Sequence, residues 1–193
     1  VRRIKRKGGG VEGGAGKVVG ALLASVGALP FLPLLGIPAR SGTSRFFVEL
    51  AMKPYGAIAG WDTGLGKTRL AVALALLLEA KHALLVTYAF LIPEFEAKLS
   101  ELDLSKGRWK TLRRSEDVRE LAGINLVSYE FLRSMCSPQS SNKSTWASRS
   151  LRKKISLLLL DEGELISRQD SQQTMAVCGL RPKRTYIFSA TPM

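Results

Sequence analysis

The chain has 193 residues, with 29 lysines and arginines against 16 acidic residues, and its net charge is +13. Hydrophobic residues make up 46% of it, which excludes wholesale disorder and allows one domain with a buried core. Two cysteines and one histidine exclude a disulfide scaffold, a cysteine zinc site and a His-rich metal centre. The positive charge indicates a polyanionic partner, either nucleic acid or an anionic membrane surface.

Residues 1–46 form an extension that is basic, apolar and rich in glycine and proline. They contain eight basic residues and one acidic residue, and residues 18–39 form an uncharged apolar run. The run is long enough to span a bilayer, although Pro30 and Pro33 would interrupt a helix there. Membrane insertion, a targeting signal and packing on the domain all stay open for this extension. We otherwise expect an intracellular protein, cytoplasmic or nuclear.

Residues 47–193 alternate strand-like apolar runs with helical runs, which predicts an α/β domain with a parallel sheet and helices on both faces. The expected strands are 57–61, 83–88, 125–129, 155–160 and 185–190, and the expected helices are 67–80, 93–102 and 130–135. The serine-rich residues 137–149 are expected to form a loop. In such a sheet, ligands bind at the carboxyl ends of the strands.

A glycine-rich turn between the first strand and the first helix has the features of a phosphate-binding loop. Its predicted ATP-binding residues are Thr63, Gly64, Leu65, Gly66, Lys67, Thr68 and Arg69. Backbone N–H groups of such a turn surround phosphate oxygens, Lys67 reaches the β- and γ-phosphates, and the Thr68 hydroxyl binds Mg²⁺. Trp61 occupies the place of the first glycine of the full pattern. The match is therefore imperfect, and other motifs in the chain must decide whether this turn binds phosphate.

The second candidate element is the acidic run that follows four leucines, Asp161-Glu162-Gly163-Glu164. A carboxylate at the end of a buried strand is costly unless it holds a cation, so Asp161 is predicted to bind Mg²⁺ together with Thr68. Glu162 is predicted to orient and deprotonate an attacking water, which makes Glu162 and Lys67 the expected catalytic residues. An acidic surface turn is the alternative for this run taken alone, but the phosphate loop upstream favours a site for ATP and Mg²⁺.

The third element is Ser189-Ala190-Thr191-Pro192, directly after the last expected strand. In this order, the phosphate loop, the acidic run and Ser-Ala-Thr resemble motifs I, II and III of superfamily 2 helicases. Residues 84–93 and 127–132 resemble motifs Ia and Ib of the Swi/Snf-like branch, which translocates on double strands. Five motifs in the family's order make this resemblance specific.

The resemblance implies the first P-loop RecA-like domain of such a motor, with the chain ending after motif III. The partners it implies are nucleic acid, with double-stranded DNA favoured over RNA, and a second RecA-like domain on the remainder of the chain or on another protein. The resemblance places Tyr88, Ser128 and Tyr129 near the nucleic-acid backbone. It makes Ser189, Ala190 and Thr191 the residues that couple nucleotide state to nucleic-acid binding. Glu164 replaces the usual histidine of motif II, so a weaker contact between motifs II and III is expected.

The sequence therefore predicts the ATP-binding first motor domain of a nucleic-acid-dependent ATPase, which by itself hydrolyses ATP slowly or not at all. One alternative is a membrane- or assembly-associated P-loop NTPase that acts as a switch or a packaging motor. Another is an inactive remnant that binds polyanions. Stimulation by nucleic acid would favour the motor over the switch, and failure to bind ATP would favour the remnant.

Overall fold

The structure is a computed structural model, and it describes residues 49–60, 66–102, 104, 107–136, 142–166 and 168–190. The chain divides into two units, Val1–Glu49 and Leu50–Met193, and the elements below belong to the second. The extension 1–46 lies outside the described residues, as do Thr63, Gly64, Leu65 and Thr191. The roles predicted for these residues therefore stay predictions.

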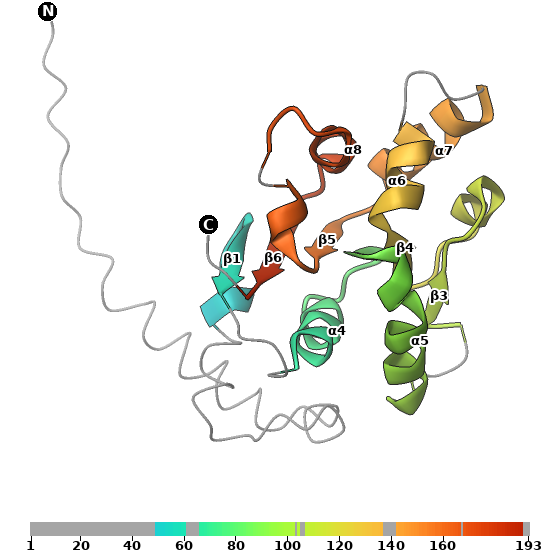
Figure 1. Ribbon diagram of the computed structural model, residues 1–193. Helices are drawn as coiled ribbons and strands as arrows, with labels where there is room; N and C mark the ends of the chain where they lie inside the picture. The colour runs from blue at the N-terminus through green and yellow to red at the C-terminus, as the bar shows by residue number, and fades with distance from the viewer. Residues whose placement is uncertain are drawn as a thin grey trace, which may run out of the picture. The chain divides into compact units, whose positions relative to one another are not determined.

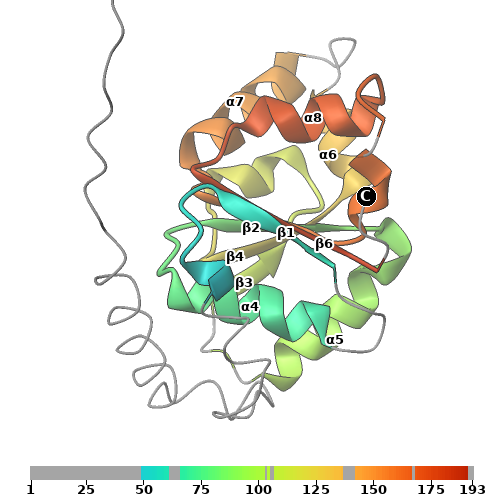
Figure 2. The ribbon, with the colours of Figure 1, turned by 90° about the vertical axis from the view of Figure 1, so that its left-hand side faces the viewer.

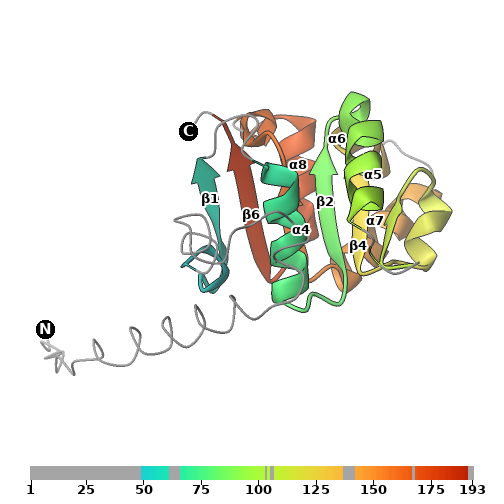
Figure 3. The ribbon, with the colours of Figure 1, turned by 90° about the horizontal axis from the view of Figure 1, so that it is seen from below.

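Six parallel strands form one sheet with the order β1-β6-β5-β2-β4-β3 (Figures 1 and 3). Their bounds are Gly56–Gly60 for β1, Ala83–Thr87 for β2, Trp109–Thr111 for β3, Ile124–Ser128 for β4, Leu157–Leu160 for β5 and Arg184–Ser189 for β6. Every residue of β2, β4 and β5 is buried, as expected for strands covered on both faces. The predicted all-parallel sheet is confirmed.

Helices cover both faces of this sheet, α4 and α5 on one face and α6, α7 and α8 on the other (Figure 2). Their bounds are Lys67–Leu77 for α4, Ile92–Glu101 for α5, Tyr129–Cys136 for α6, Asn142–Lys154 for α7 and Gln172–Leu180 for α8. Short 3₁₀ turns follow or precede strands at Ala89–Leu91 (η1), Ser115–Arg119 (η2) and Gly163–Ile166 (η3). None of the helices within the described ranges is long and apolar enough to cross a membrane.

The largest buried cluster fills the space between the central strands and the helices α6, α7 and α8. Leu158 and Leu160 of β5 pack there with Leu132 of α6, Leu151 of α7 and Leu180 of α8. On the other face, α4 buries Val72, Ala73 and Leu74 completely. Because α4 is enclosed in this way, its first residues, Lys67 and Thr68, are fixed beside the sheet.

The structure corrects the expected loop at residues 137–149, because α7 begins at Asn142. Ala147 and Leu151, four residues apart, are both fully buried in the core cluster and place one face of the helix on the sheet. The polar composition of this segment concealed the helix, since most other residues of α7 are serine or basic. β3 and α8 also had no counterpart among the expected elements.

The first helix ends three residues earlier than expected, at Leu77 rather than Ala80. Glu79 has a φ of 46°, in the left-handed region, so the helix cannot continue through it. Ala80 instead donates its N–H to the Ala75 carbonyl at 3.2 Å, which closes the end of the helix.

Gly163, in the acidic run after β5, is required by a close approach between η3 and β6. A Cβ at this position would overlap with Cγ2 of Ile187 in β6. Since Cγ2 is attached directly to the Ile187 Cβ, rotation of a flexible side-chain end cannot relieve the overlap. Glycine here lets the acidic run pack directly against β6.

We predict that Gly163→Ala lowers the free energy of unfolding by about 1–3 kcal/mol, because overpacking forces the backbone or Ile187 to move. Urea denaturation measures this change. Gly179→Ala is the matched control, since a Cβ there meets nothing within 4 Å and alanine favours the α8 helix. Equal stability of the Gly163→Ala variant and the unmodified chain would contradict the close approach.

Candidate nucleotide-binding site

Helix α4 begins at the end of the predicted phosphate loop. Gly66 has a φ of 83°, which is left-handed and favours glycine, and its carbonyl accepts the N–H of Leu70 at 3.0 Å. Lys67 and Thr68 follow as the first two residues of the helix. The N–H groups of this first turn are not used within the helix and point toward its N-terminus, where they attract anions.

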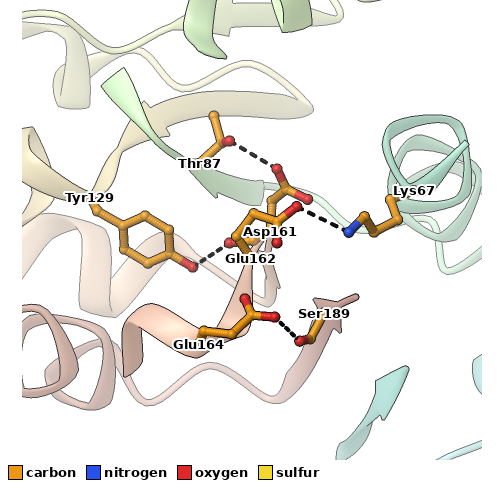
Figure 4. A network of polar contacts seen from close by, with 7 residues as sticks. All are labelled: Lys67, Thr87, Tyr129, Asp161, Glu162, Glu164 and Ser189. Carbon is orange, nitrogen blue, oxygen red and sulfur yellow. Dashed lines mark hydrogen bonds and ion pairs between the residues drawn. The ribbon is translucent and has the colours of Figure 1, made fainter. Parts of the chain in front are cut away.

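Lys67 meets the acidic run across the site. Its Nζ lies 3.0 Å from Oε1 of Glu162 and donates to it (Figure 4). The side chains are 10% and 27% exposed, so the ion pair is largely shielded from water. Glu162 has a φ of 51°, a left-handed conformation that is costly for a residue with a Cβ and is found mostly where function requires it.

Three hydrogen bonds fix Asp161. Its Oδ2 accepts the Thr87 hydroxyl at 3.0 Å, its carbonyl accepts the Tyr129 hydroxyl at 2.7 Å, and its N–H donates to Val86 at 2.9 Å (Figure 4). The residue is 6% exposed, and burial raises the pKa of its carboxyl, while the Thr87 hydrogen bond opposes that rise. Asp161 is therefore a rigidly oriented, poorly solvated acid at the end of a strand.

The side chains present fit a magnesium ion. The Thr68 hydroxyl is buried at the start of α4, and Asp161 is buried at the end of β5, so both donors are oxygens. Among the described residues no three His, Cys, Asp or Glu side chains group closely enough to enclose a metal. Mg²⁺ is typically held by one or two carboxylates together with waters and phosphate oxygens, which suits this sparse set.

A cavity of about 620 Å³ opens at this point. Predicted site residues line one side of it: Gly66, Lys67, Thr68, Arg69, Asp161 and Glu162. The other side consists of α5 and the turn before it, which the sequence analysis did not assign to the site: Leu91, Glu94, Phe95, Ala97, Lys98 and Glu101. The structure thus brings the described part of the phosphate loop and the acidic run to one cavity.

Comparison with known proteins identifies solved structures with a similar fold. No family model and no curated protein matches the sequence. Among solved structures, the SWI2/SNF2 ATPase core of Sulfolobus solfataricus in complex with double-stranded DNA aligns with a TM-score of 0.63 at 18% identity, over 77% of this chain and 31% of that one. A hypothetical ATP-dependent RNA helicase of Sulfolobus tokodaii aligns with a TM-score of 0.57 at 15% identity, over 91% of this chain and 50% of the other.

The chain therefore has a RecA-like fold, similar to that of these ATPase and helicase structures. It spans about a third of the length of the first of these structures and half of the second.

The acidic run after β5 and the end of β6 are in direct contact. Ser189, the last residue of β6, donates its hydroxyl to Oε1 of Glu164 (Figure 4). The expectation that this contact is weaker than with the usual histidine stays a prediction, although a carboxylate can accept the Ser189 hydroxyl strongly. Ala190 follows at the end of the strand.

The residues expected near nucleic acid occupy three different environments. Tyr88 follows β2, half-buried, with its ring centroid 5.1 Å from that of Phe90, which is 73% exposed. Burial and the nearby carboxylates of Glu162, Glu164, Glu130 and Asp161 raise the pKa of Tyr88. Ser128 accepts the N–H of Phe131 at 3.1 Å and so caps α6.

The predicted contact of Tyr129 with nucleic acid is wrong, because this residue is only 1% exposed and cannot touch nucleic acid directly. It supports Asp161 instead. The sequence analysis also missed Thr87, which donates to Asp161, and Glu130. The Glu130 carboxylate accepts the N–H of Ala89 at 3.2 Å and so connects the segment after β2 to α6. A threonine at the end of the apolar run of β2 was the available signal for Thr87.

We predict that Asp161→Asn raises the melting temperature of the nucleotide-free chain at pH 7 by about 2–5 °C. The pKa of Asp161 is raised by burial, so its ionisation destabilises the folded state at pH 7. That cost disappears as the pH falls below about 4, where the carboxyl is protonated in both states. Calorimetry across this pH range should show the advantage of the variant shrinking.

Asp117→Asn is the control, because it should change the melting temperature in the opposite direction. Burial alone would raise the pKa of Asp117, but the N–H groups of Arg113 and Arg114 hold it below its usual value. Its ionised form therefore stabilises the fold at pH 7, and this variant should melt at a lower temperature. A destabilised Asp161→Asn variant at pH 7 would contradict the cost assigned to the buried charge.

Proposed function

We propose that the chain is the ATP- and Mg²⁺-binding first motor domain of a nucleic-acid-dependent ATPase, a helicase or a double-strand DNA translocase. The observation that carries this proposal is the contact of Lys67 with Glu162 beside Asp161, at the 620 Å³ cavity where α4 begins. Phosphoryl transfer needs a lysine and a helix N-terminus for the phosphates, a carboxylate for the metal and a second carboxylate for water. This set of residues supplies all four.

Each residue has a chemical role in this proposal. The first turn of α4 and Lys67 bind the triphosphate, and Thr68 and Asp161 hold Mg²⁺, which neutralises charge on the phosphate oxygens. Phosphate binding gives Lys67 a new partner, so Glu162 loses its ion pair and can accept a proton from the attacking water. Thr87 and Tyr129 keep Asp161 in one orientation, which avoids reorganisation during the reaction.

Nucleic acid is the proposed partner because the neighbouring structures include an ATPase core on double-stranded DNA and a hypothetical RNA helicase. The double-strand preference proposed here rests on the likeness of the sequence to motifs Ia and Ib of the Swi/Snf-like branch. Tyr88 and the start of α6 at Ser128 lie at the carboxyl ends of β2 and β4, next to each other in the sheet. Contacts there would go to the phosphate backbone and carry little base specificity.

A second RecA-like domain is proposed to complete the site. Transition-state charge on the γ-phosphate needs a cation opposite Lys67. The other cations lining the cavity are Arg69 and Lys98; Arg69 is exposed on the first turn of α4, and Lys98 donates to Glu94 within α5. Neither side chain forms a hydrogen bond or ion pair with Glu162, so the proposed arginine comes from the partner domain.

We predict that Lys67→Ala abolishes binding of ATP with Mg²⁺, while Glu162→Gln keeps binding and loses hydrolysis at least about 10²-fold in the two-domain protein. Fluorescent nucleotide titration measures binding, and phosphate release measures turnover. Glu79→Gln is the control, because Glu79 is another glutamate with positive φ but lies at the far end of α4. Full activity of Glu162→Gln would remove Glu162 from the catalytic role.

We further predict that these 193 residues alone turn over ATP slowly, with or without DNA, because an arginine finger contributes on the order of 10³–10⁵ in rate. Adding the partner domain should restore turnover that rises with nucleic acid. Rapid DNA-stimulated hydrolysis by the 193 residues would overturn the need for a second domain. Restored turnover that does not rise when nucleic acid is added would favour the alternative of a P-loop switch.

A further inference from the structure

The parallel topology brings the beginnings of all six strands to one edge of the sheet, which we call the amino edge, opposite the cavity at the strand ends (Figure 3). We define it as the five positions before each strand. Its described basic residues are Lys53, Lys81, Arg108, Arg119, Arg152, Lys153, Lys154, Arg181 and Lys183. Its described acidic residues are Glu79 and Glu120.

Charge is divided across the sheet as a result. The five positions after β4 and after β5 carry four acidic residues, Glu130, Asp161, Glu162 and Glu164, against one basic residue, Arg133. Among the described residues, the ion pairs are Lys67–Glu162, Lys98–Glu94 and Arg113–Glu96, and none of them involves a residue of the amino edge. The positive charge there is therefore not neutralised by ion pairs with described residues.

A cavity of about 370 Å³ lies within this edge, between the ends of α4 and the beginnings of β5 and β6. Lys81, Lys183 and Arg184 line it together with the Ser156 hydroxyl, and Glu79 is its one acidic lining residue. Lys81 and Lys183 are exposed, whereas Arg184 is half-buried and donates to the Ala51 carbonyl at 3.4 Å. Cations converging on a hollow surface are suited to phosphate groups.

We infer that the amino edge binds the phosphate backbone of a second segment of nucleic acid, separate from the segment expected beside Tyr88 and Ser128. The two surfaces lie at opposite ends of the strands, and five residues of β2 extend about 17 Å. A straight duplex that lies across the strand ends at one edge does not reach the other edge, so in this orientation two segments, or one sharply bent segment, are needed to occupy both. The choice of nucleic acid as the polyanion rests on the proposed function.

A lipid surface fits the edge less well. Proteins that bind anionic membranes through a surface combine basic residues with apolar side chains that enter the bilayer. The exposed large apolar residues described at this edge, Met52 and Tyr55, precede the outer strand β1, and none of that group lines the cavity. The cations around the cavity therefore lack apolar anchors beside them.

The test measures binding of the 193-residue chain to a duplex of about 30 base pairs over a range of salt concentrations, without ATP. The edge variant is Lys81→Gln, Lys153→Gln and Lys183→Gln together, and a second variant replaces the same three by Arg. The remote variant, Arg114→Gln, Arg133→Gln and Arg168→Gln, removes equal charge from positions outside this edge. Thermal melting confirms that each variant is folded.

The edge variant should reduce the slope of log affinity against log salt by about 2–3, since each lost phosphate contact accounts for about 0.9, and should weaken binding at least about tenfold at 0.1 M salt. The Arg variant should keep both values, and the remote variant should keep most of the slope. The unmodified chain on an immobilised duplex should also capture a second, labelled duplex, and the edge variant should not.

An unchanged slope in the edge variant, or an equal loss in the remote variant, would overturn the inference. Failure of the unmodified chain to capture a second duplex would overturn the claim of two segments. Loss of binding to phosphatidylserine vesicles with nucleic-acid binding intact would assign the edge to membranes instead. None of these measurements uses ATP, so their failure is distinguishable from that of the proposed ATPase function.

Discussion

The architecture of the candidate site depends on one costly constraint, a carboxylate buried at the end of β5. Asp161 is removed from water by α6 and β2, and this desolvation raises its pKa. Thr87, Tyr129 and Val86 offset part of the cost with hydrogen bonds, and each belongs to an element that packs directly on β5 or on its neighbour. A cation would offset the rest, so the fold is arranged for a ligand that carries positive charge into the site.

The same constraint connects regions that are far apart in sequence. Thr87 is followed by Tyr88 and η1, while Tyr129 is followed by Glu130, which accepts the Ala89 N–H. Tyr88 and Ser128, which are proposed to lie near nucleic acid, are therefore each one residue from a group that orients Asp161. Glu164 and Ser189 add a further connection from the acidic run to β6. Movement of either segment would directly displace groups that hydrogen-bond to Asp161.

Sequence patterns predicted the sheet and the core of the site because their signals are local. Apolar runs mark the buried strands β2, β4 and β5, and the order of glycine, lysine and threonine before a helix marks the phosphate loop. Helix α7 was missed because a few buried residues, Ala147 and Leu151 among them, define its face while serines and basic residues dominate its composition. The role of Tyr129 was misassigned, and the part of α5 in lining the cavity was missed, because both depend on which elements pack side by side, which no single run of residues records.

The position of β6 in the sheet has a consequence for the order of assembly. β1 pairs with β6 and with no other described strand, and β6 is also the partner that connects it to β5. Residues 184–189 therefore insert between two strands that are already synthesised. During translation, β1 joins the rest of the described sheet only after nearly every other described element exists, so the strand that precedes Lys67 is among the last to reach its final position in the sheet.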